Sequence, residues 1–315
     1  MTLSADQILL SAKQAWNAFQ SPNPGMIFIA VSAVLLLFVI IWALFYRKVP
    51  PFQKALVNGA AHQVRYYLKA GLADPNGRDE TGMTPLMTAA TFNKKPAVCA
   101  VLIKAGADVN AKDDKGMTAF LHAVANNAPV AVLNVLAKRK SVLTERNADG
   151  QSAWTLALSN HPKTETLRWL LSHKFDINER DPNGMTPLMI AVEQNTSPEI
   201  VRFLLDSGAR VSDRAEYGIT PLMLSAGRNL NPYVLLILLE RGAGLEDRSA
   251  EGLTPLMYAA AFNPNAPEIV DVLIECGAKV AAVDKDGRTA LDYAQKNSRL
   301  YDTETYWRLN NLSYE

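Results

Sequence analysis

A short tetrapeptide, Thr-Pro-Leu-Met, recurs along the chain at an almost constant spacing. Intact copies begin at Thr84, Thr186, Thr220 and Thr254, and degenerate copies begin at Thr118, Ser152 and Thr289. Successive copies lie 34 residues apart five times in a row, and the last interval is 35 residues. A repeat of this length indicates a solenoid, in which each unit contacts only its neighbours. Such a stack usually presents a recognition surface and rarely a catalytic pocket.

The residues around each copy predict a unit of two antiparallel helices. Gly184 suits a tight hairpin turn, Thr186 suits a helix N-cap, and Pro187 suits the first helical position. A second helix is expected over 199–205, and a hairpin then leads to the next unit. The methionine of the tetrapeptide is expected to fill an apolar core between units, because its side chain adapts to irregular gaps.

These residues resemble the ankyrin repeat. The Gly-x-Thr-Pro-Leu signature, the small pairs at 89–90 and 259–260, and Gly-Ala-Asp-Val-Asn at 106–110 follow its pattern. The resemblance covers about residues 50–312, as about eight repeats including a capping repeat at each end. It implies an all-α ankyrin-repeat solenoid that recognises proteins through its concave face, which hairpin tips and first helices form.

The chain departs from the family pattern in two repeated positions. The fourth position of the tetrapeptide, where the family usually carries histidine, is methionine in the intact copies and Leu121 or Thr155 in two degenerate copies. The family's glycine at the end of the first helix is mostly asparagine here, as at Asn93, Asn127 and Asn263. Asparagine tolerates the left-handed conformation better than other non-glycine residues, so we expect left-handed caps at these positions.

The middle of the solenoid diverges further. Lys140 and Lys174 replace the glycine that ends the second helix elsewhere, and Ser152-Ala153-Trp154-Thr155 replaces the tetrapeptide. A lysine in the left-handed region costs roughly 1 kcal/mol, so this stretch is expected to be the least stable. Two explanations of this stretch remain open, namely drift in the solenoid middle and adaptation of Trp154 and its neighbours to a partner.

Composition and motifs exclude several function classes. The chain has 32 basic and 31 acidic residues, so no global field favours nucleic acid. No catalytic or metal-ligating motif occurs, so neither an enzyme nor a cofactor is expected. Cys99 and Cys276 lie too far apart in a solenoid to pair, and are expected to be free thiols. One basic residue per hairpin forms a row that we interpret as part of an ion-pair ladder: Arg78, Lys112, Arg146, Arg180, Arg214 and Arg248.

An uncharged segment, residues 26–46, predicts a single transmembrane helix. Its 21 residues span about 31 Å as a helix, which matches a bilayer core of roughly 30 Å. Lys13 precedes the segment, whereas Arg47, Lys48, Lys54 and Arg65 follow it. The positive-inside rule therefore predicts cytoplasmic repeats and an N-terminus outside.

The predicted organisation has five parts: a tail at 1–25, the span at 26–46, a linker at 47–49, the repeats at 50–312 and a tail at 313–315. Residues 3–20 read as an amphipathic helix. It either rests on the outer leaflet or contacts a sister membrane subunit.

We therefore predict a non-enzymatic, membrane-anchored scaffold that binds a protein partner. Two alternatives remain: a structural subunit of a larger membrane assembly, and an inhibitory or immunity-type binder of a toxin or enzyme. Interfaces are enriched in aromatic residues and arginine. The candidate partner-binding residues on the first helices are Phe92, His122, Glu193, Arg228, Tyr258 and Phe262.

Overall fold

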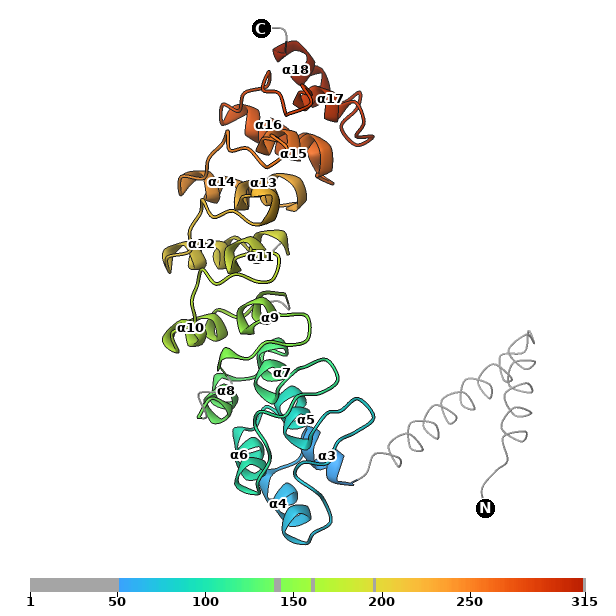
Figure 1. The fold of residues 1–315 in the computed structure, drawn as a ribbon, viewed down its shortest axis with the longest axis vertical. Helices are drawn as coiled ribbons and strands as arrows, with labels where there is room; N and C mark the ends of the chain where they lie inside the picture. Colours follow the sequence, from blue (N-terminus) through green and yellow to red (C-terminus); the bar gives the residue numbers. More distant parts are fainter. Residues whose placement is uncertain (1–50, 139–142, 160–161, 195–196, 314–315) are drawn as a thin grey trace, which may run out of the picture. The chain divides into compact units, whose positions relative to one another are not determined.

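The computed structural model describes residues 51–138, 143–159, 162–194 and 197–313 (Figure 1). The chain divides into two units, residues 1–55 and residues 56–315. The second unit is a stack of helix pairs, and every regular element in the described part of the chain is helical. The all-α solenoid expected from the repeat is thus confirmed.

Each repeat contributes a first and a second helix. The first helices are α3 (Pro51–Asn58), α5 (Pro85–Phe92), α7 (Ala119–Ala125), α9 (Ala153–Ser159), α11 (Pro187–Glu193), α13 (Pro221–Arg228), α15 (Pro255–Phe262) and α17 (Ala290–Ala294). The second helices are α4 (Ala61–Lys69), α6 (Pro96–Lys104), α8 (Val130–Leu136), α10 (Thr164–Ser172), α12 (Pro198–Asp206), α14 (Pro232–Glu240), α16 (Ala266–Glu275) and α18 (Glu304–Leu312). A short 3-10 turn, η2 (Glu216–Gly218), lies in one hairpin.

Each intact tetrapeptide starts its first helix in the predicted way, at α5, α11, α13 and α15. The Thr84 hydroxyl accepts a hydrogen bond from the Met87 N–H at 3.4 Å, and Pro85 takes the first helical position. The Met87 sulfur accepts the Thr84 N–H at 3.3 Å, and its side chain is fully buried. The methionine therefore fills the inter-repeat core, as expected, and also satisfies a backbone donor at the helix start.

Each hairpin turns at a glycine with positive φ. At Gly116 φ is 71°, and a Cβ there would lie 2.6 Å from the Ala148 backbone nitrogen of the next hairpin. The turn is closed by the side chain of Asp113, whose Oδ1 accepts the N–H groups of Lys115 and Met117 at 2.9 and 2.8 Å. Glycine is thus required both for conformation and for close packing of hairpins.

The predicted left-handed asparagine caps are mostly wrong. Among the described asparagines at this position, only Asn127 adopts positive φ, at 50°, whereas Asn93, Asn229 and Asn263 have φ of −96°, −80° and −73°. Their side chains point back into the preceding repeat instead. The Asn263 amide donates to the carbonyls of Ala226 at 2.7 Å and Asn229 at 3.0 Å, and its Oδ1 accepts the Asn265 N–H at 2.7 Å.

The same arrangement recurs along the stack, and we call it the asparagine clasp. The clasp residues share a side-chain amide that reaches a backbone carbonyl one repeat earlier: Asn93, Asn229, Asn263 and Asn297. The first three of them are at most 3% exposed. A buried amide with satisfied hydrogen bonds favours the native stacking, because leaving its partners unpaired is costly.

The divergent middle is packed, but with irregularities. Lys174 has φ of 63°, which confirms the predicted left-handed lysine. Trp154 is fully buried, and its Nε1 lies within the described core without a hydrogen-bond partner. The indole therefore belongs to the core and does not itself contact a partner, while adaptation of its neighbours to a partner stays a prediction.

The predicted transmembrane segment at 26–46 and the amphipathic segment at 3–20 lie outside the described residues. Among the helices from Pro51 to Leu312, none is long and apolar enough to cross a bilayer. Both cysteines are free thiols, Cys99 buried and Cys276 exposed, as expected.

Candidate protein-recognition surface

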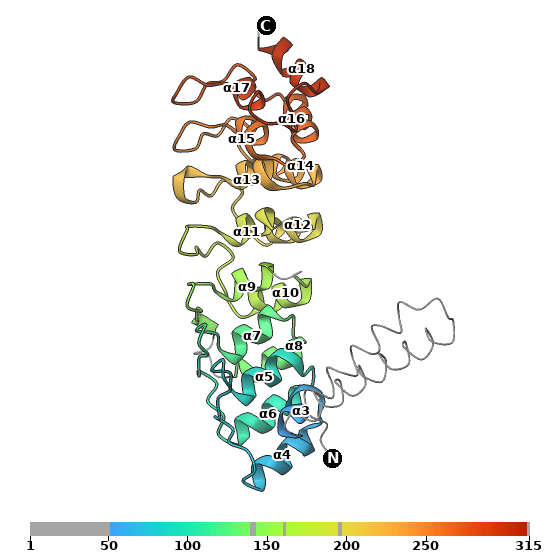
Figure 2. The same ribbon diagram turned by 90° about the vertical axis from the view of Figure 1, so that its right-hand side faces the viewer.

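The helix pairs and hairpins of the second unit form three parallel rows (Figure 2). Hairpins project on one side, the first helices α9, α11, α13, α15 and α17 form the middle row, and the second helices α10, α12, α14, α16 and α18 lie opposite the hairpins. Residues near the ends of successive first helices are thus placed side by side.

Four of the predicted residues come together on α11, α13 and α15, and we call them the Arg228 strip: Glu193, Arg228, Tyr258 and Phe262. An ion pair joins the Arg228 Nη1 to the Glu193 Oε1 of the preceding repeat. The Tyr258 and Phe262 rings lie 5.6 Å apart on α15. Charge and aromatic surface are therefore adjacent over three repeats.

The strip is partly pre-organised and still accessible. The Arg228 side chain is 64% exposed and Phe262 is 57% exposed, while Tyr258 is half-buried. Gly227 leaves room for the Tyr258 ring, since a Cβ there would lie 3.3 Å from its Cδ1. Burial raises the pKa of Tyr258, although Ser249 and the Arg228 charge act in the opposite direction. The phenol is consequently a neutral hydrogen-bonding group at physiological pH.

Phe92 and His122 lie apart from the strip. Phe92 is 57% exposed at the end of α5, with four first helices between it and α15. It is therefore an exposed aromatic side chain outside the strip, and its assignment to a partner-binding surface stays a prediction.

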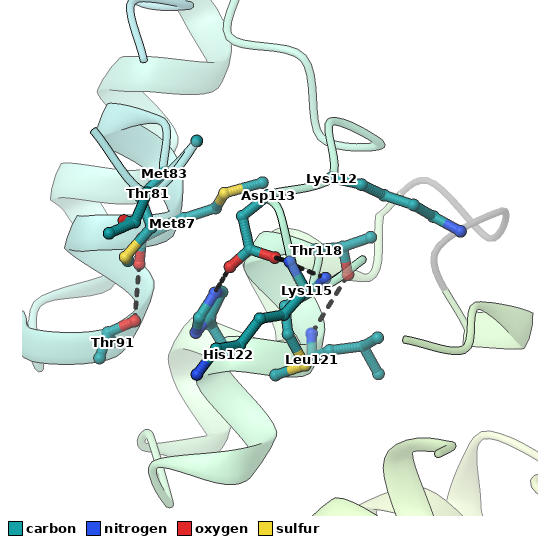
Figure 3. A network of polar contacts seen from close by, with 12 residues as sticks. Thr81, Met83, Met87, Thr91, Lys112, Asp113, Lys115, Thr118, Leu121 and His122 are labelled. Atoms are coloured by element: carbon teal, nitrogen blue, oxygen red, sulfur yellow. Dashed lines mark hydrogen bonds and ion pairs between the residues drawn. The ribbon is translucent and has the colours of Figure 1, made fainter. Parts of the chain in front are cut away.

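His122 is committed to its own repeat (Figure 3). Its Nε2 lies 2.8 Å from Oδ2 of Asp113, and the two side chains are only 15% and 5% exposed. Since the other oxygen of Asp113 closes the hairpin, the ring ties the hairpin to α7. The structure thus gives His122 an internal partner, and its assignment to a partner-binding surface stays a prediction.

One exposed aromatic residue was not anticipated from the sequence. Tyr217 is 71% exposed in η2, where its φ is 58°. In other hairpins an Asp, Asn or Ser closes the turn, but Ala215 occupies that position here. The replaced turn residue was the available signal, because losing the side-chain acceptor permits a different backbone conformation.

The basic row is used internally. Arg214 Nη1 donates to the carbonyls of Gly218 at 3.0 Å and Arg248 at 2.8 Å, and Nη2 pairs with Asp247 at 2.8 Å. The same pairing with an acid in the following repeat joins Lys112 to Glu145, Arg146 to Glu179 and Arg180 to Asp213. The predicted ion-pair ladder is confirmed at these four positions, whereas Arg78 and Arg248 donate to backbone carbonyls of the following repeat. Both kinds of contact hold successive hairpins together.

The divergent middle contains a hollow of about 400 Å³ whose lining includes Glu179, His173 and Asp176. Burial raises the pKa of Glu179, although hydrogen bonding from Ser152 and the charge of Arg146 act to lower it. The Glu179 carboxyl group therefore interacts with the neighbouring side chains of Ser152 and Arg146. Within the described residues, no cluster of three or more His, Cys, Asp or Glu is arranged to hold a metal ion.

Comparison with known proteins agrees with this architecture. The family model described as ankyrin repeats (3 copies) matches residues 52–145, 120–215 and 222–303. The crystal structure of the ankyrin repeat domain of Bcl-3, described as a unique member of the IkappaB protein family, is 28% identical with a TM-score of 0.59. That match covers 72% of this chain and 99% of the other.

No curated protein matches the sequence. The family match alone extends over far more than half of the chain, and ankyrin repeats generally mediate protein–protein interaction. The tetrapeptide register, the helix pairs and the family match lead to one conclusion: the chain belongs to the ankyrin repeat family.

Proposed function

We propose that this protein is a non-enzymatic, membrane-anchored scaffold that binds a protein partner through the hairpin-and-first-helix face. The observation that carries the proposal is the Arg228 strip, which combines an exposed arginine with two neighbouring aromatic rings on successive repeats. Arginine and aromatic residues dominate the energetics of protein interfaces. Glu193 orients the guanidinium, so less side-chain entropy is lost when a partner binds.

The test compares partner recovery by two matched variants of the full chain. Phe262→Ala removes an exposed ring from the strip, whereas Tyr233→Ala removes an exposed ring from α14, on the opposite row. We expect Phe262→Ala to weaken binding of the captured partner roughly thirtyfold, which corresponds to a hot spot of about 2 kcal/mol. Tyr233→Ala should leave the dissociation constant unchanged.

Arg228→Ala separates a binding role from a packing role. It should weaken binding as much as Phe262→Ala does, while the melting temperature stays that of the parent, because an exposed ion pair contributes little to stability. Equal partner affinity in the parent, Phe262→Ala and Arg228→Ala would contradict the strip as the binding surface.

The membrane attachment is proposed from residues 26–46, whose uncharged length matches a bilayer core. The basic residues that follow support cytoplasmic repeats, with the N-terminus on the other side. Sealed vesicles of known orientation provide the test. Protease should digest the repeats in inside-out vesicles and spare them in right-side-out vesicles, and the reverse pattern would refute the proposed topology.

Attachment to sister membrane subunits through residues 3–20 and 26–46 is the finer alternative. Removing residues 3–20 should then release the co-purifying membrane proteins, whereas Phe262→Ala should not. Release by Phe262→Ala alone instead supports the scaffold.

A further inference from the structure

The second helices α4 and α6 border a hollow of about 520 Å³ that is separate from the Arg228 strip. Its lining combines three cationic side chains, Arg65, Lys69 and Lys104, with the apolar side chains of Leu68, Val101 and Ala105. No acidic side chain contributes to this lining. We call it the basic groove.

In the described part of the chain, no acidic side chain neutralises the cations of the basic groove. Across the described ranges, no ion pair involves Arg65, Lys69 or Lys104, while basic residues farther along the stack, such as Arg146, Arg214 and Arg308, pair with acids. The flanking sequence explains the difference, because residues 51–73 and 91–107 contain no Asp or Glu.

The second helices also change sign along the stack. Helix α4 carries Arg65 and Lys69 with no acid, whereas α16 carries Glu268, Asp271 and Glu275 with no base. The positive charge is therefore concentrated in the repeats that directly follow the proposed membrane segment. A local field of this kind attracts anions even though the net charge of the chain is only +1.

We propose that the basic groove binds the headgroup phosphate of an anionic phospholipid. Lysine and arginine are the side chains that recognise phosphate, as point charges and as a bidentate fork respectively. The apolar side chains of the groove suit the glycerol and proximal acyl carbons next to that phosphate. A membrane source is favoured because only nine residues separate Tyr46 from Leu56, so the inference rests on the proposed membrane attachment.

The expected strength follows from the charge. A Lys or Arg near an anionic membrane contributes roughly a fivefold gain in affinity, so the three cations together give on the order of a hundredfold. The effect should weaken with salt, because exposed charges are screened within about 10 Å at 0.1 M ionic strength.

The experiment uses the full chain in nanodiscs of phosphatidylcholine alone, or of phosphatidylcholine mixed with phosphatidic acid. Acetic anhydride then labels the lysines, and mass spectrometry measures the rate at each site. We expect Lys69 and Lys104 to react about fivefold more slowly in the anionic discs. The exposed Lys279 and Lys285 in the C-terminal repeats are the internal control and should react equally in both discs.

A matched pair of variants links the protection to the groove. Arg65→Gln removes one groove cation and leaves both reporter lysines, so the affinity for phosphatidic acid should fall about fivefold and the protection of both lysines should decrease. Arg210→Gln removes an exposed arginine outside the groove and should leave the protection intact. The control lysines report whether either variant has unfolded.

Three outcomes would overturn the proposal. Equal labelling of Lys69 and Lys104 in both discs shows that the groove does not meet the lipid. Protection in neutral discs by added inorganic phosphate assigns the site to a soluble anion. Protection by soluble polyglutamate, without protection by phosphatidic acid, assigns it to an acidic peptide.

Failure of the membrane attachment is recognised separately. Incorporation into neutral discs is measured first, and a chain that stays outside them refutes the anchor. Phosphatidic acid vesicles are then added to that soluble chain. Protection of the two lysines still supports the groove, and unchanged labelling overturns it.

Discussion

At the scale of single residues, the hydrogen bonds that a polar side chain makes matter more for its state than the number of charges in the chain. In the C-terminal repeat, burial alone would raise the pKa of Asp284, but hydrogen bonds from Tyr293, Arg288 and Asp286 lower it to about 2. The Tyr293 hydroxyl donates to Oδ2 at 2.6 Å, and Arg288 Nε donates to the same oxygen at 3.0 Å. Asp284 therefore stabilises the terminal repeat as an anion.

This pKa predicts the acid response of the terminal repeat. Because the pKa is lowered in the folded state, the stabilisation is complete above the ordinary value of 3.8 and is lost as pH falls toward 2. Tyr293→Phe removes one donor, so the folded-state pKa rises and we expect a loss of roughly 1 kcal/mol at neutral pH. Acid titration followed by circular dichroism should show unfolding at higher pH than in Tyr301→Phe, the control with an exposed phenol. Identical acid profiles in the two variants would contradict this account.

At the scale of the structural element, the asparagine clasp explains how one helix pair is fixed to the one before it. The sequence predicted the end of each first helix to within about a residue, but for most of these asparagines it predicted the wrong cap conformation. Asparagine can adopt the left-handed conformation or use its amide in a hydrogen bond, and the sequence alone does not show which carbonyls lie within reach. Asn127, with φ of 50°, follows the first option, and Asn263 follows the second.

Glycine substitution distinguishes the two asparagine conformations. Asn263→Gly removes three hydrogen bonds of a buried side chain and relieves no positive φ, so we expect a loss of roughly 2–3 kcal/mol. Asn127→Gly should cost much less, because glycine adopts its positive φ without strain. Urea unfolding of both variants measures the difference. A smaller loss at Asn263 than at Asn127 would count against the clasp.

The left-handed lysine provides an opposite test. Lys174→Gly should raise the free energy of unfolding by about 1 kcal/mol, since glycine adopts φ of 63° without a Cβ penalty. Lys163→Gly is the control, because Lys163 has φ of −96° and gains nothing from glycine. Urea denaturation should separate the two variants, and a stabilisation of equal size in both would argue against strain at Lys174.

At the scale of the whole solenoid, stability is distributed repeat by repeat, because contacts join only neighbouring units. The least regular stretch combines the strained Lys174 with the unpaired indole nitrogen of Trp154. We therefore expect amide hydrogens of α9 and α10 to exchange faster than those of α13 and α15. Hydrogen-exchange mass spectrometry checks this, and Lys174→Gly should slow the exchange locally. Uniform protection along the stack would contradict a weak middle.

The solenoid was predictable from the sequence because the diagnostic motif recurs, so that each copy of the tetrapeptide supports the interpretation of the others. The aromatic and arginine residues of the Arg228 strip were also predictable, since helical register places them on one face. Tyr217 and the basic groove were missed for a common reason. The exposure of Tyr217 depends on how its hairpin turn closes, and the groove depends on which second helices pack next to each other. The spacing of the repeat alone does not show either feature.

The asparagine clasp gives the stack a direction, because the later repeat supplies the amide and the earlier one supplies the carbonyl. Trimming the protein from its two ends should therefore be unequal. Removing repeats from the C-terminal side uncovers carbonyls that water can solvate. Removing them from the N-terminal side instead strands an inward-facing asparagine, so shortened versions that keep the early repeats should tolerate the cut better.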